Sequence, residues 1–277
     1  MSPLVFVSTL FGISLGAGFL GSLIGLGGGI VVVPVLTLVY GIDIRYAIGA
    51  SVVSVIATSS GAAAAYVRQH LTNLRTAMLL ELGTTAGAIT GAFVAGILRG
   101  RVLFIIFGVV MGYSAVAMLR RVREPDRPVE PDRWADRLRL HGSYYDESQK
   151  KQIDYKVTHT WLGLGLMYLA GMISGLLGIG SGALKVPAMD LAMRIPIKVS
   201  TATSNFMIGV TAAASAGVYF ARGDIDPIIA AAVAIGVTIG ATGGSFLLTR
   251  TDNYVIRVVF VAVLLAVSAQ MVWKGLR

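Results

Sequence analysis

The stretch GLGGGIVVVP, residues 25–34, places three consecutive glycines and a proline inside one of the most apolar regions of the chain. It recurs 153 residues later as GIGSGALKVP, residues 178–187, and the same offset holds without a gap far downstream. The matched positions include Gly18 with Gly171, Gly29 with Gly182, Pro34 with Pro187, Ser51 with Ser204, Gly83 with Gly236, Gly87 with Gly240 and Gly91 with Gly244. So many glycines in register indicate an internal duplication.

The composition is that of a chain whose outer surface faces lipid. The 277 residues are 55% hydrophobic and 13% charged, with a mean hydropathy of +0.77, whereas a soluble domain is typically about 25% charged. Apolar blocks long enough to cross roughly 30 Å of hydrocarbon cover residues 4–23, 46–67, 76–98, 102–119, 160–177, 200–220, 228–248 and 255–272. Core helices of a large soluble protein are the alternative, but their outer members would need a polar face. We therefore expect an all-α, multi-pass integral protein of the cell membrane, with the N-terminal block as its first span.

The duplication divides the chain into a first transmembrane repeat, residues 1–120, a charged linker, 121–157, and a second transmembrane repeat, 158–277. We expect about five helical segments in each repeat: a long helix that breaks at the glycines, a short helix, and three full spans. Pro34 and Pro187 lie inside the short helices and are expected to be structural. The linker is expected in the cytoplasm, as a solvated loop or with a short amphipathic helix over residues 133–140.

The relative orientation of the repeats depends on the short helices. If each short helix crosses the membrane, an odd number of crossings inverts the second repeat relative to the first. If each dips in and returns, the repeats are parallel. The distribution of Lys and Arg under the positive-inside rule favours inversion by a small margin. Inverted repeats around broken helices are also common in secondary transporters, so we expect the inverted arrangement.

The glycine breaks predict a binding site. Irregular backbone in hydrocarbon leaves N–H and C=O groups without partners, at a cost of several kcal/mol each, and two breaks at matching positions point to a site at the membrane midplane. A short helix begins after each break, and the free N–H groups at a helix N-terminus favour anions. The candidate substrate-binding backbone positions are Gly27, Gly28, Gly29, Gly180, Ser181 and Gly182.

The glycines allow two other interpretations. A dinucleotide-binding fingerprint needs a preceding strand and a soluble βαβ unit, which the membrane-length flanks exclude. Close helix packing through small residues four apart accounts well for Gly83, Gly87 and Gly91 and for their copies in the second repeat. It accounts poorly for three glycines in a row ahead of a proline.

Polar side chains follow each short helix. Hydroxyl and amide groups donate hydrogen bonds to oxyanions and cost less to bury than charges, so they are candidates for the same substrate site. The alternative for each hydroxyl is a hydrogen bond back to the preceding helical turn, whereas an amide in a span usually needs a partner on another helix or on a ligand. The candidates are Ser51, Ser54, Thr203, Ser204 and Asn205.

Two ionisable residues inside apolar blocks are functional candidates by default. Lys185 comes three residues after Gly182 and can reach an anion at the break; the alternatives are snorkelling or a pair with an acid elsewhere. Glu81 has no evident partner nearby in the sequence and is a candidate for coupling transport to a proton or a cation.

The charge and residue usage exclude several functions. The net charge of +9 comes largely from Lys and Arg at the ends of apolar blocks, where they act as topology signals and headgroup anchors, so no nucleic-acid partner is expected. The chain has no cysteine, and its three histidines, His70, His141 and His159, lie in loops or near span ends. No catalytic residue, metal site or cofactor is therefore predicted, and the protein is not expected to be an enzyme.

The paired stretches GFLGSLIGLGGGIVVVPVL and GLLGIGSGALKVPAMDLAMRIPIKVSTATSNFMIG resemble the motifs of the TauE/SafE sulfite exporter family of membrane permeases. The resemblance covers both repeats and implies a secondary transporter, expected to export small sulfur-containing anions such as sulfite, thiosulfate or organosulfonates by alternating access. It also implies ion coupling or exchange; an anion channel of the same architecture is the alternative, and a homodimer is allowed. The chain departs from the family pattern at Ser181, at Lys185 and in its longer linker.

Overall fold

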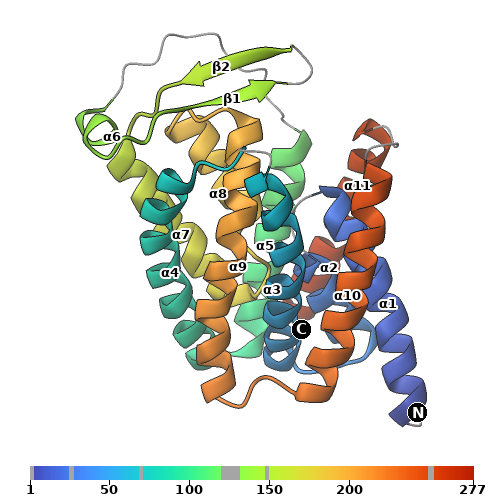
Figure 1. The fold of residues 1–277 in the computed structure, drawn as a ribbon. Helices are drawn as coiled ribbons and strands as arrows, with labels where there is room; N and C mark the ends of the chain where they lie inside the picture. Colours follow the sequence, from blue (N-terminus) through green and yellow to red (C-terminus); the bar gives the residue numbers. More distant parts are fainter. Residues whose placement is uncertain (1–2, 25–27, 69–70, 120–131, 147–149, 249–252) are drawn as a thin grey trace.

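The computed structural model describes residues 3–24, 28–68, 71–119, 132–146, 150–248 and 253–277 (Figure 1). The first repeat contains α1 (Pro3–Ile24), α2 (Gly29–Pro34), the π-helical η1 (Val35–Val39), α3 (Ile44–Arg68), α4 (Leu74–Ile97) and α5 (Gly100–Leu119). The linker contains α6 (Arg133–Arg137), β1 (Gly142–Asp146) and β2 (Lys151–Tyr155). The second repeat contains α7 (Thr160–Leu177), α8 (Gly182–Pro187), the π-helical η2 (Ala188–Ala192), α9 (Ile197–Ala221), α10 (Pro227–Leu248) and α11 (Asn253–Leu276).

The short helices have the same form in both repeats. The bounds of α2, η1 and α3 recur 153 residues later as those of α8, η2 and α9. Pro34 and Pro187 each end an α-helical turn, and a π-helical turn follows each of them. Proline lacks the N–H that an α-helix needs, and local π-helix is one way to absorb that loss. The prolines therefore bend both short segments in the same way.

The helices pair across the two repeats. α1 packs against α10 as α7 packs against α4, while α3 packs against α9 and α5 against α11. Glycines make the first two pairs close: a Cβ on Gly87 of α4 would lie 2.1 Å from the carbonyl oxygen of Tyr168, and one on Gly240 of α10 would lie 1.9 Å from that of Leu15. This confirms a packing role for the described glycines spaced four apart, Gly83, Gly87, Gly91, Gly236 and Gly240, while the surroundings of Gly244 lie outside the described part of the structure.

The outer surface of the bundle is apolar. Leu82, Ile97 and Phe220 are 70%, 84% and 75% exposed. Among the described residues, α4 and α7 are long and apolar enough to cross a membrane alone, and six further apolar stretches of 10–17 residues lie in the other helices. Exposure of this kind suits a surface that faces lipid.

The linker elements lie together at one end of the helices (Figure 1, top). β1 and β2 form an antiparallel hairpin, and Leu140 and Val157 are fully buried against the bundle. The amide nitrogen Nδ2 of Asn73 donates 2.8 Å hydrogen bonds to the carbonyl oxygen of Leu140 and to the hydroxyl of Tyr155. The described part of the linker is therefore docked on the bundle, unlike the solvated loop that the sequence favoured, and its helix is limited to Arg133–Arg137.

Asp132 attaches the beginning of the linker helix to α7. Its carboxylate accepts hydrogen bonds from the backbone N–H of Trp134, at 3.2 Å, and from that of Thr160, at 3.0 Å. These donors, the N–H of Trp134 first, hold the pKa of Asp132 below its ordinary value because they stabilise the ionised carboxylate. One side chain thus caps α6 and ties it to the start of the second repeat.

Candidate functional site

The two helix breaks meet beside α3. Ser51 is fully buried, and its hydroxyl donates a 2.7 Å hydrogen bond to the carbonyl oxygen of Gly178, just after α7 ends. A Cβ on Gly29, the first residue of α2, would lie 2.5 Å from Oγ of Ser51 and 3.0 Å from that same carbonyl oxygen. The start of α2 and the end of α7 are therefore in contact, on the surface of α3 that carries Ser51.

Glycine is required around the second break. Gly178 and Gly180 have φ values of +66° and +59°, in the left-handed region that favours glycine. A Cβ on Gly180 would also lie 3.0 Å from side-chain atoms of both Val55 and Ile208. Gly180 therefore lies between α3 and α9, where the two repeats face each other.

The first break is also tightly packed. Gly28 is buried, and a Cβ there would lie 2.5 Å from Cγ1 of Val237 on α10. Gly27 was predicted with Gly28 and Gly29, but it lies outside the described residues. The two described glycines of this group therefore allow α2 to approach α3 and α10 closely.

Several N–H groups at the start of α8 already have acceptors within the chain. The N–H of Ser181 donates to Oγ of Ser174, at 3.2 Å, and the N–H of Gly182 donates to the carbonyl oxygen of Gly180, at 2.7 Å. These two groups would have to exchange partners before they could hold an anion. The side chains near the breaks are therefore the better candidates for ligands in this conformation.

Lys185 is the most deeply buried charge among the described residues, with none of its surface exposed. Its Nζ donates a 2.6 Å hydrogen bond to Oγ1 of Thr211 on α9. An ammonium group has three N–H donors, and Thr211 is its one hydrogen-bond partner in the described part of the chain. Two donors of Lys185 are therefore available at the centre of the protein.

Glu81 on α4 lies on the other side of Thr211. Its Oε1 accepts hydrogen bonds from the hydroxyl of Thr211, at 2.7 Å, and from that of Thr85, at 3.1 Å. Its Oε2 is buried and has no hydrogen-bond partner among the described residues. Glu81 and Lys185, which the sequence treated separately, thus belong to one buried network through Thr211. This geometry agrees with the alternative in which Lys185 pairs with an acid elsewhere in the chain, here Glu81 through Thr211.

Two further predicted hydroxyls are buried near these groups in the fold. Ser181 is the residue before α8, four positions ahead of Lys185, and Ser204 comes two turns before Thr211 on α9. Oγ of each is buried and has no hydrogen-bond partner in the described part of the structure. A buried hydroxyl without a partner is costly, so both are candidates to bind a ligand or a water molecule.

The remaining polar candidates have partners within the protein. Ser54 donates to the carbonyl oxygen of Ser51 at 2.7 Å, which is the back-bonded alternative. Nδ2 of Asn205 donates to the carbonyl oxygen of Thr201 in its own helix at 3.1 Å, not to another helix. Oγ1 of Thr203 accepts from the backbone N–H of Asn73 at 3.1 Å. This last contact joins α9 to the loop that holds the linker.

The central residue of the network, Thr211, was visible in the sequence only as one of several hydroxyls after the second short helix. Ser174, which supports the start of α8, was not singled out at all. The only sequence signal for Thr211 or Ser174 is that each is a polar residue inside an apolar block. Their roles follow from which helices pack together.

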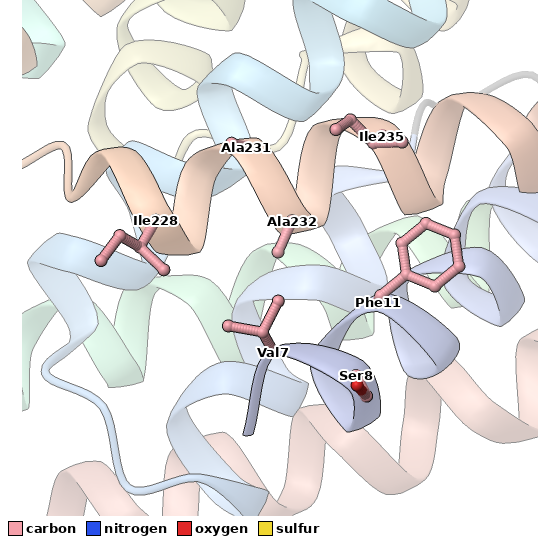
Figure 2. A pocket seen from close by; sticks show the side chains of 7 residues that line it. All are labelled: Val7, Ser8, Phe11, Ile228, Ala231, Ala232 and Ile235. Carbon is pink, nitrogen blue, oxygen red and sulfur yellow. The ribbon is translucent and has the colours of Figure 1, made fainter. Parts of the chain in front are cut away.

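The described surface pockets lie away from this network. The groove between α1 and α10 is lined by Val7, Ser8, Phe11, Ile228, Ala231, Ala232 and Ile235 (Figure 2). Its lining contains one hydroxyl and no charged group, so it is suited to apolar chains and not to an anion. The buried network between α4, α8 and α9 therefore remains the candidate functional site.

Comparisons with known proteins agree with this architecture. The family model described as "Sulfite exporter TauE/SafE" matches residues 10–271. The probable membrane transporter protein YunE of Bacillus subtilis (strain 168) is 27% identical over 267 residues, which cover 94% of this chain and 95% of the relative. A probable membrane transporter protein of Xylella fastidiosa (strain 9a5c) is 28% identical over 263 residues, which cover 93% and 92%. No solved structure matches.

The relatives are named as membrane transporters, and the family match extends across both repeats and the linker. With its helical architecture and apolar surface, the chain is a multi-pass membrane transporter. It belongs to the TauE/SafE sulfite exporter family.

Proposed function

We propose that the protein is a secondary transporter that exports small sulfur-containing anions, such as sulfite or organosulfonates, by alternating access around the buried network. The observation that carries this proposal is Lys185, a fully buried ammonium that follows a helix break and keeps two N–H donors without described partners. Burial of a charge is unfavourable unless it is paired. An anion that receives those donors would complete the pairing.

The hydroxyls of Ser181 and Ser204 suit the same class of substrate. Each is buried without a described partner; Ser181 directly precedes α8, which carries Lys185, and Ser204 lies on α9 with Thr211. Sulfite and sulfonates present three oxygens in a compact group, and such oxygens accept hydrogen bonds from ammonium and hydroxyl donors. We propose that these three side chains bind the substrate together.

We further propose that the two repeats are inverted, with the linker in the cytoplasm. Contacts at the two ends of α3 and α9 support this arrangement. A Cβ on Gly49, near the start of α3, would lie 2.3 Å from the carbonyl oxygen of Asp224, which follows α9. At the other end, Thr203 near the start of α9 bonds to Asn73, which follows α3. Counterpart helices that run in opposite directions are expected for inverted repeats, which suit alternating access.

The test is transport by purified protein in proteoliposomes. We expect saturable uptake of labelled sulfite or of a labelled organosulfonate that is accelerated by the same anion on the opposite side. Single-channel current steps would instead identify the alternative, an anion channel, and the absence of any anion flux would overturn the proposal.

The role of Lys185 is tested by binding. Lys185→Ala is expected to weaken the thermal stabilisation of the protein by these anions by about 10- to 100-fold in concentration, because a hydrogen bond to a charged group contributes about 1.5–3 kcal/mol. Lys151→Ala, which changes an exposed lysine of β2, is the matched control. Equal stabilisation of Lys185→Ala and the control would remove Lys185 from the site.

A further inference from the structure

The network that holds Lys185 also contains a group that can take a proton when an anion binds. We propose that Glu81 carries one proton with each monoanion, so that transport is an electroneutral symport of a proton and an anion. This inference rests on the proposed function, since it concerns the same site. Thr211 is the residue through which Glu81 and Lys185 respond to each other.

The hydroxyl of Thr211 can change the acceptor to which it donates its hydrogen bond. It has one proton to donate, and two acceptors are in reach: Oε1 of Glu81, at 2.7 Å, and the carbonyl oxygen of Met207, at 2.8 Å. Nζ of Lys185 donates to the same hydroxyl oxygen. When Glu81 is ionised, the hydroxyl donates to it and links the two charges. When Glu81 is protonated, the hydroxyl can donate to Met207 and the positive charge of Lys185 is left without a counterion.

Charge balance then couples the anion to the proton. An ionised Glu81 neutralises Lys185, so a monoanion added to that pair would leave a net negative charge in a buried site, which is unfavourable. A proton on Glu81 removes this obstacle, because the anion then takes the place of the carboxylate as the counterion of Lys185. The loaded site contains one positive and one negative charge, and the empty site with ionised Glu81 contains the same. The carrier therefore moves no net charge.

The unpartnered oxygen of Glu81 supports a direct role. Oε2 is buried without a described hydrogen-bond partner, and a protonated carboxyl group has one O–H donor. That O–H can donate to an oxygen of the bound anion. Glu81 would thus bind the substrate only in the form that carries the proton.

Glu81 has one charged partner within this hydrogen-bonded network. Lys185 is the only charged side chain joined to Glu81 through the hydrogen bonds of the described residues. The other titratable or charged groups on the elements packed around it are Arg45, Tyr46, Tyr66 and Arg68 on α3, Arg75 on α4, Tyr168 on α7, Asp190 on η2, and Lys198, Tyr219 and Arg222 on α9 or at its end. On α4 and α9 the nearest of these are Arg75, six residues from Glu81, and Tyr219, eight residues from Thr211, each more than one helical turn away.

The network occurs once in the chain, with Glu81 from the first repeat and Lys185 and Thr211 from the second. The offset of 153 matches Lys185 with Val32, Glu81 with Ala234 and Thr211 with Thr58. One proton site per chain predicts a ratio of one proton to one anion. Net movement then follows the sum of the two gradients, so export occurs when the outward anion gradient exceeds the inward proton gradient.

The experiment uses proteoliposomes and a labelled sulfonate, methanesulfonate, whose charge does not change near neutral pH. With the membrane potential clamped at zero, an inside-alkaline gradient of one pH unit is expected to drive about tenfold accumulation, the ratio for one proton per anion. A membrane potential at equal pH is expected to drive none. Accumulation that follows the potential, or exchange of sulfonate with no response to the pH gradient, would overturn the symport while leaving the proposed transporter intact. The absence of all flux would overturn both.

Variants of Glu81 test whether this residue carries the transported proton. Glu81→Gln mimics the protonated carboxyl, so exchange of sulfonate should remain measurable while the tenfold accumulation disappears. Thermal stabilisation by methanesulfonate reports in parallel that the variant is folded and binds. Asp154→Asn, which changes an exposed acid of β2, is the control and should retain the accumulation. Accumulation by Glu81→Gln that equals the control would show that the proton is carried elsewhere.

Discussion

The two repeats have matching helix bounds and differ in their chemistry. The breaks, the prolines, the π-helical turns and the glycine contacts recur at an offset of 153 residues. The buried charges do not recur. The first repeat has Val32 at the position that matches Lys185, and the second repeat has Ala234 at the position that matches Glu81. Thr58 and Thr211 both bond back to their own helices, yet only Thr211 lies between charges. The duplicated features build the scaffold, and a single copy of the polar network suffices for the proposed chemistry.

The largest effect is expected from placing the charge in the wrong repeat. Val32 is 2% exposed within the apolar core, and Val32→Lys would bury an ammonium without an acid beside it. We expect a loss of about 3–5 kcal/mol in the free energy of unfolding, measured by denaturation of the detergent-solubilised protein or seen as loss of folded protein in size-exclusion chromatography.

The double variant Val32→Lys with Ala234→Glu sharpens this comparison. It places an acid at the position that matches Glu81, with Thr58 in the place of Thr211. Recovery of part of the lost stability would indicate that the matching positions, one in each repeat, can hold the same pair. No recovery would indicate that the backbones of the two halves differ at this site more than their helix bounds suggest.

An intermediate effect is expected where the repeats are alike. Gly87→Ala and Gly240→Ala would each place a Cβ within about 2 Å of a carbonyl oxygen on the facing helix, which forces the helices apart. Overpacking of this kind typically costs about 1–3 kcal/mol. Thermal unfolding should show similar losses for both variants. Gly16→Ala, where nothing lies within 4 Å of the added atom, should lose nothing, and unequal losses would contradict the equivalence of the two helix pairs.

The smallest effect is expected at the helix caps. Asn73 and Asp226 match at the offset, and both accept backbone N–H donors at the start of the fourth helix of their repeat. Asn73 also donates from Nδ2 to the linker, which an aspartate cannot do. Asn73→Asp should keep the cap but lose the bond to the carbonyl oxygen of Leu140, at about 0.5–1.5 kcal/mol, whereas the hydroxyl of Tyr155 can donate to the new carboxylate. Faster hydrogen exchange in β1 and β2 would report the loss, and Asp226→Asn should leave this exchange unchanged.

The parts of the fold that could be predicted are those that depend on local backbone chemistry. The break before Gly29 and Gly182, and the short helices that contain Pro34 and Pro187, follow from residues that act on their own backbone. The linker was harder, since its hairpin is held by Leu140, Val157 and the distant Asn73. A charged sequence alone favours a solvated loop.

The sequence by itself determined the duplication, the apolar class, the helix breaks and the two buried ionisable residues, because each is written in composition, spacing or the stereochemistry of glycine and proline. Only the tertiary structure decided that Glu81 and Lys185 share one hydroxyl, and that Gly29 meets Gly178 beside Ser51. These contacts join residues from α2, α3, α4, α8, α9 and the end of α7 that are far apart along the chain. Their formation depends on how whole helices pack, which no local pattern encodes.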